Sequence, residues 1–300
     1  ETLIGIRRRR CPKKSAVSEE IMATPTDADG MRSPRNSHVA GVSDLVRELK
    51  SGTVDTSDVM IEDDDQQAAP TIAADSAEER EALLAMEACL GDVSATAPEQ
   101  AKLMCLRGRK YDPQRAAELL PKFLELCNEL GLRQSGDHVM SAEDAAQLRK
   151  DFATTKMLVP GGKDALGRAV LIMRLRYNEP KETNPEAMGR MIACAMLCVL
   201  QDVDVQRMGV VILNDAREIG FRNMDPRVPK FIFGKVLGRL PVRVGRIVVF
   251  HPPFIVGRIL LPLMINFIIP KLKKRMSVIN GGKIVTIHEF IHKEALFAEY

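Results

Sequence analysis

The chain has 300 residues, of which 45% are hydrophobic and 28% are charged, and its formal net charge is only +3. This is the composition of a globular protein with room for one large domain or two small ones. The most apolar run, residues 259–269, contains Pro262 and is too short for a membrane-spanning helix, which needs about 20 apolar residues. The cysteines form no CxxC pair and no regular spacing, which favours a reducing, cytosolic setting over a disulfide framework.

Residues 1–77 are predicted to form a disordered, acidic and polar tail. They combine Pro, Ser, Asp and Gly with few large apolar residues, and their acidic residues are densest at 62–65. The basic run at residues 7–10 is interpreted as part of a solvated tail, with nucleic acid or anionic lipid as alternative partners.

Residues 78–135 are predicted to form a small all-helical subdomain. The helical pattern begins near Ser76, a second helix fits residues 98–107, and a third follows Asp112 with Pro at its first helical position. Gly131 is predicted to end the third helix.

Residues 136–300 are predicted to form an α/β domain. Short apolar runs alternate with helical periodicities in the order strand 169–173, helix 185–201, strand 210–213, helix 229–240 and strand 247–250. This alternation is typical of a mostly parallel sheet with flanking helices.

The segment after Pro252 and Pro253 is predicted to be a helix that is apolar on nearly every side, over residues 254–268. Such a helix must be buried or must meet apolar partners on both faces. A gate over a pocket meets both conditions, with a ligand inside and lipid tails outside. A plain core helix is the alternative interpretation.

The stretch from Arg207 to Arg275 is strongly basic, since its only acidic residues are Asp215, Glu218 and Asp225. A basic half implies a polyanionic partner, either nucleic acid or an anionic membrane surface. We expect the membrane and no nucleic acid, because the stretch shows no aromatic interleaving and no zinc-finger or RNP-type motif.

Six segments, in order from about residue 98 to the end, resemble elements of one family. They are Leu106–Asp112 (LRGRKYD), Gly167–Leu175 (GRAVLIMRL), Val210–Gly220 (VVILNDAREIG), Arg246–Phe254 (RIVVFHPPF), Pro270–Val278 (PKLKKRMSV) and Ile287–Tyr300 (IHEFIHKEALFAEY). The family that they resemble is the CRAL-TRIO family of lipid-binding proteins. The resemblance implies a helical N-terminal part and an α/β domain whose sheet floors a hydrophobic pocket under a mobile gate helix.

The function implied by this resemblance is binding of a single hydrophobic lipid and its transfer between membranes. The lipid would be a phosphoinositide or a tocopherol- or retinoid-like molecule, and the protein would be cytoplasmic and peripheral to membranes, with no cofactor. The alternative is a non-transporting lipid-sensing regulatory or adaptor module that binds a protein partner through residues 1–77.

Two sets of residues are expected to carry this function. The predicted pocket lining comprises Leu171, Met173, Leu175, Met196, Leu200, Val211, Leu213, Phe231, Phe250, Phe254, Ile259, Met264 and Phe267. The predicted phosphoinositide and membrane contacts are Arg243, Arg246, Lys271, Lys273, Lys274 and Arg275. Only every second strand residue can face the pocket, and the sequence leaves open which half does so.

One motif suggests an enzyme instead. His288, Glu289 and His292 match HExxH, which on a helix places two imidazoles on one face to bind zinc, with the Glu as base. The residues that follow offer no evident third ligand, and GxSxG, Walker A and GxGxxG motifs are lacking. We therefore expect no catalytic residue and no metal, with a zinc hydrolase as the alternative.

Overall fold

The computed structural model describes residues 72–91, 96–132, 140–141, 143–144, 146–147, 150, 156–182, 184–225, 227–254, 256–261, 275–280 and 287–300. The predicted disordered tail therefore lies almost wholly outside the described residues. Residues 262–274, which include the later part of the predicted gate helix, also lie outside them. The proposed domain boundaries after residues 77 and 135 stay predictions.

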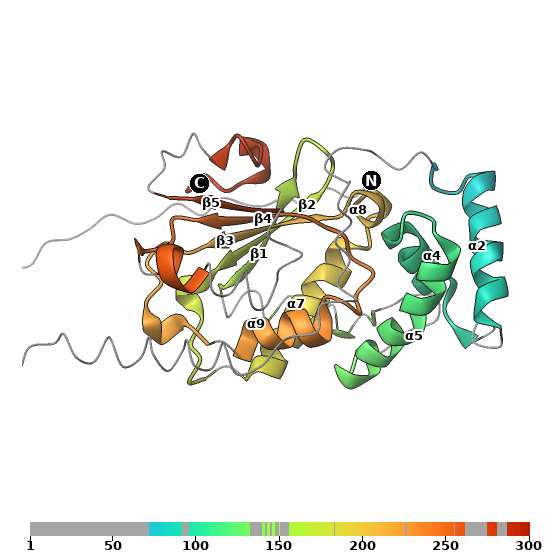
Figure 1. Ribbon diagram of the computed structural model, residues 1–300, viewed down its shortest axis with the longest axis horizontal. Helices are drawn as coiled ribbons and strands as arrows, with labels where there is room; N and C mark the ends of the chain where they lie inside the picture. The colour runs from blue at the N-terminus through green and yellow to red at the C-terminus, as the bar shows by residue number, and fades with distance from the viewer. Residues whose placement is uncertain are drawn as a thin grey trace, which may run out of the picture.

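A five-stranded sheet with the order β1-β2-β3-β4-β5 forms the centre of the fold (Figure 1). Its strands are β1 (Leu158–Lys163), β2 (Ala169–Arg174), β3 (Val210–Asp215), β4 (Val244–Phe250) and β5 (Met276–Ile279). Strands β2 to β5 are parallel, and only β1 pairs in the antiparallel sense. The prediction of an α/β fold with a mostly parallel sheet is thus confirmed.

The outer strand β1 contains two consecutive glycines, Gly161 and Gly162, before its last residue, Lys163. These residues belong to an edge strand, where Pro160 is tolerated because one side of the strand needs no ladder hydrogen bonds. A Cβ on Gly161 would lie 2.7 Å from the carbonyl oxygen of Ala295. Glycine therefore lets residues 287–300, here called the C-terminal segment, approach the strand closely.

Helices cover one face of the sheet and the C-terminal segment covers the other (Figure 1). The helical face carries α7 (Pro185–Val199), α8 (Val203–Met208) and α9 (Arg227–Phe231), which continues as the π-helix η3 (Ile232–Val236). The predicted helix 229–240 is therefore shorter than expected and changes its hydrogen-bond pattern midway. Shorter elements are η1 (Leu175–Tyr177), η2 (Phe221–Asn223), η4 (Val256–Leu260) and η6 (Lys293–Ala295).

Three helices precede the sheet, close to their predicted positions: α2 (Ala77–Leu90), α4 (Glu99–Gly108) and α5 (Pro113–Glu129). Their starts have local causes. Ser76 caps α2 by accepting a hydrogen bond from the Glu79 amide, and Asp112 caps α5 in the same way through Arg115. Among the described residues, no helix is both long and apolar enough to cross a bilayer.

A buried ion pair joins these helices to the α/β domain. The Arg107 guanidinium donates to both carboxylate oxygens of Glu79, each at 2.7 Å, and to Gln206 Oε1 at 2.7 Å. The Tyr111 hydroxyl adds a bond to Glu79 Oε1 at 3.1 Å. Since Glu79 is only 2% exposed and Arg107 4%, each charge depends on its protein partners.

The ionisation of Glu79 should make this junction sensitive to acid. Burial opposes the charge, but hydrogen bonds from Arg107 and the Asp75 amide outweigh it and hold the pKa of Glu79 below 4.5. A lowered pKa stabilises the fold above the unfolded-state value, and this contribution is lost as the pH falls through the folded-state value. The Glu79→Gln substitution should lower the free energy of unfolding at neutral pH by about 3–5 kcal/mol, because it leaves Arg107 charged and poorly paired.

Denaturant unfolding at a series of pH values tests this expectation. The deficit of the variant should shrink as the pH falls through the lowered pKa of Glu79, where wild type also loses the carboxylate. Glu81→Gln, on the exposed side of the same helix, serves as the control and should change little. A deficit that stays constant down to acid pH would contradict the role assigned to the Glu79 charge.

Candidate functional site

A cavity of about 200 Å³ lies between the sheet and its helical layer. The floor comes from the sheet, through Met173, Ile212, Asn214, Ile247, Val249 and Met276. The cavity extends to the loops that follow β2 and β3. It therefore reaches the carboxyl ends of the parallel strands, which is where open α/β sheets bind ligands.

The helical wall of the cavity is apolar. It consists of Ile192 and Met196 on α7 and of Val228, Pro229, Ile232, Phe233 and Leu237 in and after α9. The π-helix η3 thus lies in the wall, in agreement with the usual occurrence of such turns at functional sites. The remaining apolar lining comes from Leu175, Ala216, Ile219, Met224, Val256 and Leu261.

Strand alternation decides which predicted residues reach the cavity. Met173 lines it, as do Leu175 just after β2 and Met196 on α7. Val211, Leu213 and Phe250 do not, because they point to the opposite face and pack under the C-terminal segment. That half of the strand prediction is corrected by the pleat, which sends neighbouring residues to opposite faces.

Leu171 and Leu200 lie on the helical side but outside the cavity. Both are fully packed in the core beside α7, with exposures of 2% and 0%. Phe231 is partly buried against the same core and does not line the cavity either.

The segment after β4 contributes both to the cavity and to the surface. Phe254 does not line the cavity and is 75% exposed, with the Arg258 guanidinium 5.8 Å from its ring centre. Val256 and Leu261, from the same segment, line the cavity. Ile259 belongs to η4, but its side chain lies outside the described residues, as do Met264 and Phe267.

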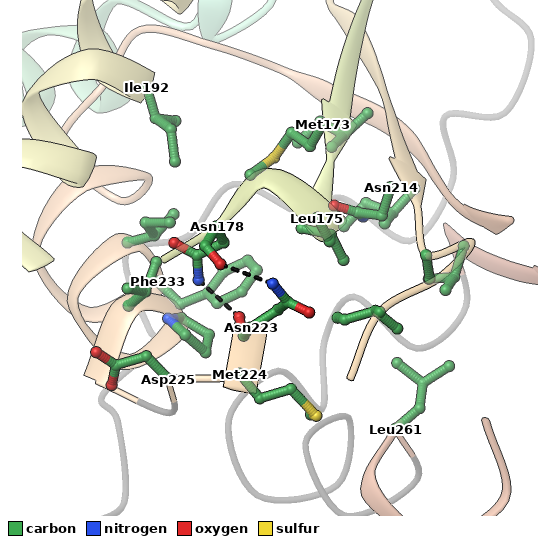
Figure 2. A pocket seen from close by; sticks show the side chains of 18 of the residues that line it. Met173, Leu175, Asn178, Ile192, Asn214, Asn223, Met224, Asp225, Phe233 and Leu261 are labelled. Atoms are coloured by element: carbon green, nitrogen blue, oxygen red, sulfur yellow. Dashed lines mark hydrogen bonds between the residues drawn. The ribbon is translucent and has the colours of Figure 1, made fainter. Parts of the chain in front are cut away.

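One end of the cavity is polar, which the sequence did not indicate. Asn178 and Asn223 face each other there (Figure 2): Asn178 Nδ2 donates to the Asn223 carbonyl at 2.8 Å, and Asn223 Nδ2 donates to the Asn178 carbonyl at 2.9 Å. Asn178 follows η1 and Asn223 ends η2, both short 3-10 turns with no hydrophobic period, so only the fold brings the two residues together. A general preference of Asn for turns was the sole sequence signal.

Asp225 brings negative charge to this end of the cavity. Its carboxylate accepts from Arg227 Nη2 at 2.7 Å. Burial opposes ionisation, but the Arg227 hydrogen bonds outweigh it and lower the pKa of Asp225. The side chain of Asp225 is only 3% exposed whereas that of Arg227 is 58% exposed, so the carboxylate is the buried partner of the pair.

The predicted basic contacts do not form one surface with the cavity lining. Arg243 donates to the Arg207 carbonyl and Arg275 donates to the Val244 carbonyl at 2.7 Å, both near the amino end of β4. Arg246 lies over the Phe290 ring, at 5.0 Å, on the opposite face of the sheet. A register shift between β3 and β4 turns Arg246 to that face. Lys271, Lys273 and Lys274 lie outside the described residues.

The HExxH residues lack the helix that the motif requires. Ile287 to Phe290 make a single turn, and His292 is extended, with a ψ of 144°. The side chain of His292 is 63% exposed. Over the described ranges, no group of three His, Cys, Asp or Glu side chains is arranged to hold a metal ion.

The fold and the cavity agree with one family. Residues 153–300 match the family model of the CRAL/TRIO domain. The chain belongs to the CRAL-TRIO family. The match confirms the resemblance, and it spans every strand of the sheet and the whole described cavity lining. A search of the curated proteins found no match to this chain.

Membership of this family supports a hydrophobic lipid as the ligand, and the lining has the corresponding chemistry. Aliphatic side chains and Met make up most of the wall, while Asn178, Asn223 and Asp225 supply polar groups at one end and Asn214 supplies another from the sheet. Such a cavity suits a molecule with an apolar body and a small polar group.

Two neighbouring valines of β4 provide a paired test of the CRAL-TRIO cavity. Val249 lines the cavity, so Val249→Phe should fill it at little cost in stability and should reduce the lipid recovered with the purified protein several-fold. Val248 is fully buried on the other face, where extra volume has no space. Val248→Phe should therefore lower the free energy of unfolding by about 1–3 kcal/mol.

Denaturant unfolding and mass spectrometry of the extracted lipids measure both effects. The cavity assignment would be contradicted if Val249→Phe unfolded as easily as Val248→Phe while its surviving folded fraction retained a full complement of lipid.

Proposed function

We propose that the protein takes up one hydrophobic lipid in this cavity and transfers it between membranes. The lipid would be of the phosphoinositide, tocopherol or retinoid kind. The observation that carries the proposal is an apolar cavity lined in part by the segment that also exposes Phe254. One short stretch of chain thus touches both the site of the lipid and the surroundings.

The apolar lining makes exchange through water slow. Each square ångström of apolar lipid surface removed from water contributes about 25 cal/mol, so a bound lipid leaves unaided only rarely. Membrane contact overcomes this barrier by offering the lipid a second apolar environment. The protein then acts as a carrier that depends on collision with membranes.

The segment 254–261 is well placed to respond to a membrane. Phe254 presents a large apolar ring beside a cation, Arg258, a pairing that suits the boundary between lipid tails and headgroups. Insertion of the ring would pull on Val256 and Leu261, which line the cavity from the same segment. Opening of the cavity is thereby coupled to membrane binding.

The basic residues Lys271, Lys273, Lys274 and Arg275 extend this membrane contact along the chain. Each cation near an anionic surface contributes about 1 kcal/mol to binding. Arg243 and Arg275 belong to the same basic part of the sequence, whereas Arg246 packs on Phe290 and is the weakest candidate. Anionic lipids should therefore speed transfer, and salt should slow it.

In this role the protein is a non-enzymic carrier in the cytoplasm, peripheral to membranes. None of the described cysteines forms a disulfide, in keeping with a reducing compartment. The HExxH residues form a single turn that ends before His292, and this absence of a helix favours lipid binding over zinc hydrolysis.

Replacement of Phe254 tests the membrane-contact role. Phe254→Ala should slow transfer of a fluorescent lipid between phosphatidylcholine–phosphatidylserine vesicles by roughly tenfold, since burial of one Phe side chain is worth about 1.5–3 kcal/mol. The amount of lipid bound at equilibrium should not change, because the ring does not line the cavity. Leu84→Ala, at another exposed apolar residue, on α2, is the matched control and should transfer at the wild-type rate.

The first experiment is mass spectrometry of lipids extracted from the purified protein after exposure to a mixed membrane extract. One equivalent of a hydrophobic molecule is expected. A different outcome would favour a lipid-sensing module over a carrier. The protein would then be fully loaded with lipid, but its transfer rate would change neither in Phe254→Ala nor with the vesicle composition. Recovery of folded protein without bound lipid would contradict the proposed lipid-binding function.

A further inference from the structure

The polar end of the cavity contains a buried oxygen with no hydrogen-bond partner. Asn178 lines the cavity and is only 8% exposed. Its Nδ2 donates to Asn223, but no group in the described part of the chain donates to its Oδ1. Buried amide oxygens are nearly always paired, so an unpaired one in a ligand cavity calls for a partner.

The orientation of the Asn178 amide is set by its neighbour. Nδ2 lies 2.8 Å from the Asn223 carbonyl oxygen, and a flipped amide would place two oxygens at that distance. Oδ1 is therefore the atom left free. Figure 2 shows the two asparagines joined in this way at the edge of the cavity.

The side-chain amide of Asn223, in contrast, has hydrogen-bond partners for both its nitrogen and its oxygen. Its Nδ2 donates to the carbonyl oxygens of Arg176 at 3.0 Å and Asn178 at 2.9 Å, and its Oδ1 accepts from the Gly220 amide at 2.9 Å. Asn223 thus holds the loops together and positions Asn178. The hydrogen bonds of this pair therefore leave Asn178 Oδ1 as its one buried side-chain atom without a partner.

The charge of the lining favours a donor over an anion. Asp225 lines the cavity as a carboxylate, and no Lys or Arg is found among the described lining residues. A phosphate group presents mainly acceptor oxygens and negative charge, which would meet the Asn178 oxygen and the Asp225 carboxylate. A hydroxyl group can donate to the oxygen without introducing charge.

The geometry points to an uncharged lipid that donates a hydrogen bond, such as a long-chain or ring alcohol, with Asn178 Oδ1 as its acceptor. This inference rests on the proposed function, since it requires a lipid in the cavity. Because Asn178 Oδ1 is buried and unpaired, a hydroxyl of the bound lipid would be its hydrogen-bond partner. Selection follows because a lipid without a donor leaves this oxygen unpaired.

A competition between matched lipids tests the inference. Protein is incubated with phosphatidylcholine vesicles that contain equal amounts of a long-chain alcohol, its methyl ether, its phosphate monoester and an alcohol one methylene longer as the size control. The protein is reisolated, and its lipids are counted by mass spectrometry. Wild type should load both alcohols over the ether by roughly tenfold, equivalent to about 1.4 kcal/mol, and should not enrich the phosphate.

Two variants assign the preference to one atom. Asn178→Leu, of similar size, should load a similar total but bring the alcohol-to-ether ratio close to one. Asn214→Leu replaces another amide of the same cavity and should keep the preference. The wild-type comparison needs no variant, so the inference remains testable if Asn178→Leu fails to fold.

Three results would overturn the inference: equal loading of alcohol and ether by wild type, enrichment of the phosphate, or an unchanged ratio in folded Asn178→Leu. Each of these leaves the lipid-binding function standing, because lipid is still loaded. Failure of wild type to load any of the probes or any vesicle lipid would instead remove the proposed function and this inference together.

Discussion

The rest of the structure depends on the pleat of the central parallel sheet, which assigns alternate residues of β3 and β4 to two unlike layers. On one face Val211, Leu213, Val248 and Phe250 pack without space beneath the C-terminal segment. On the other, Ile212, Asn214, Ile247 and Val249 floor a cavity. A sheet buried on both faces is typical of strands that are apolar throughout. The close packing on the face under the C-terminal segment stabilises the fold, so the helical face can contain a cavity.

A buried carboxylate, that of Asp215, lies at the carboxyl end of strand β3. Asp215 is 0% exposed, and it accepts hydrogen bonds from Arg176, Arg217 and Tyr300 at 3.1, 2.8 and 2.8 Å. Burial opposes its charge, but the hydrogen bonds from Arg217 and Tyr300 outweigh it and lower the pKa of Asp215, while burial and the hydrogen bond to Asp215 raise the pKa of Tyr300 to about 12. The C-terminal residue is thereby tied to the loops that begin after β2 and β3. Those loops carry Asn178 and Asn223, so the arrangement that seals one face also positions the polar end of the cavity.

The cavity has three parts with separate physical tasks. Its aliphatic and Met walls supply non-directional apolar contact and can adapt to lipids of different shape. The Asn178–Asn223 pair places a buried, unpaired amide oxygen at one end, which we infer to orient the polar group of the ligand. The segment 254–261 joins the lining to an exposed aromatic ring, and the proposed lipid exchange rests on this arrangement. In the proposed function, affinity, selection and exchange are therefore assigned to different residues of one CRAL-TRIO domain.

The amino-acid sequence by itself determined the helices α2, α4, α5 and α7, the strands β2 to β4 and the α/β class, because these rest on local periodicity and caps. Ordered motifs also indicated the family. Tertiary structure alone decided which strand face is hollow, since a period of two is symmetric until one face is covered, and a register shift turned Arg246 away from the cavity. It also made a strand of the Pro- and Gly-rich β1, which pairs with β2 and lies close to Ala295, and it kept the HExxH residues from forming a helix. Asn178 became a candidate ligand contact only through the folding of two irregular loops against each other, which no local pattern encodes.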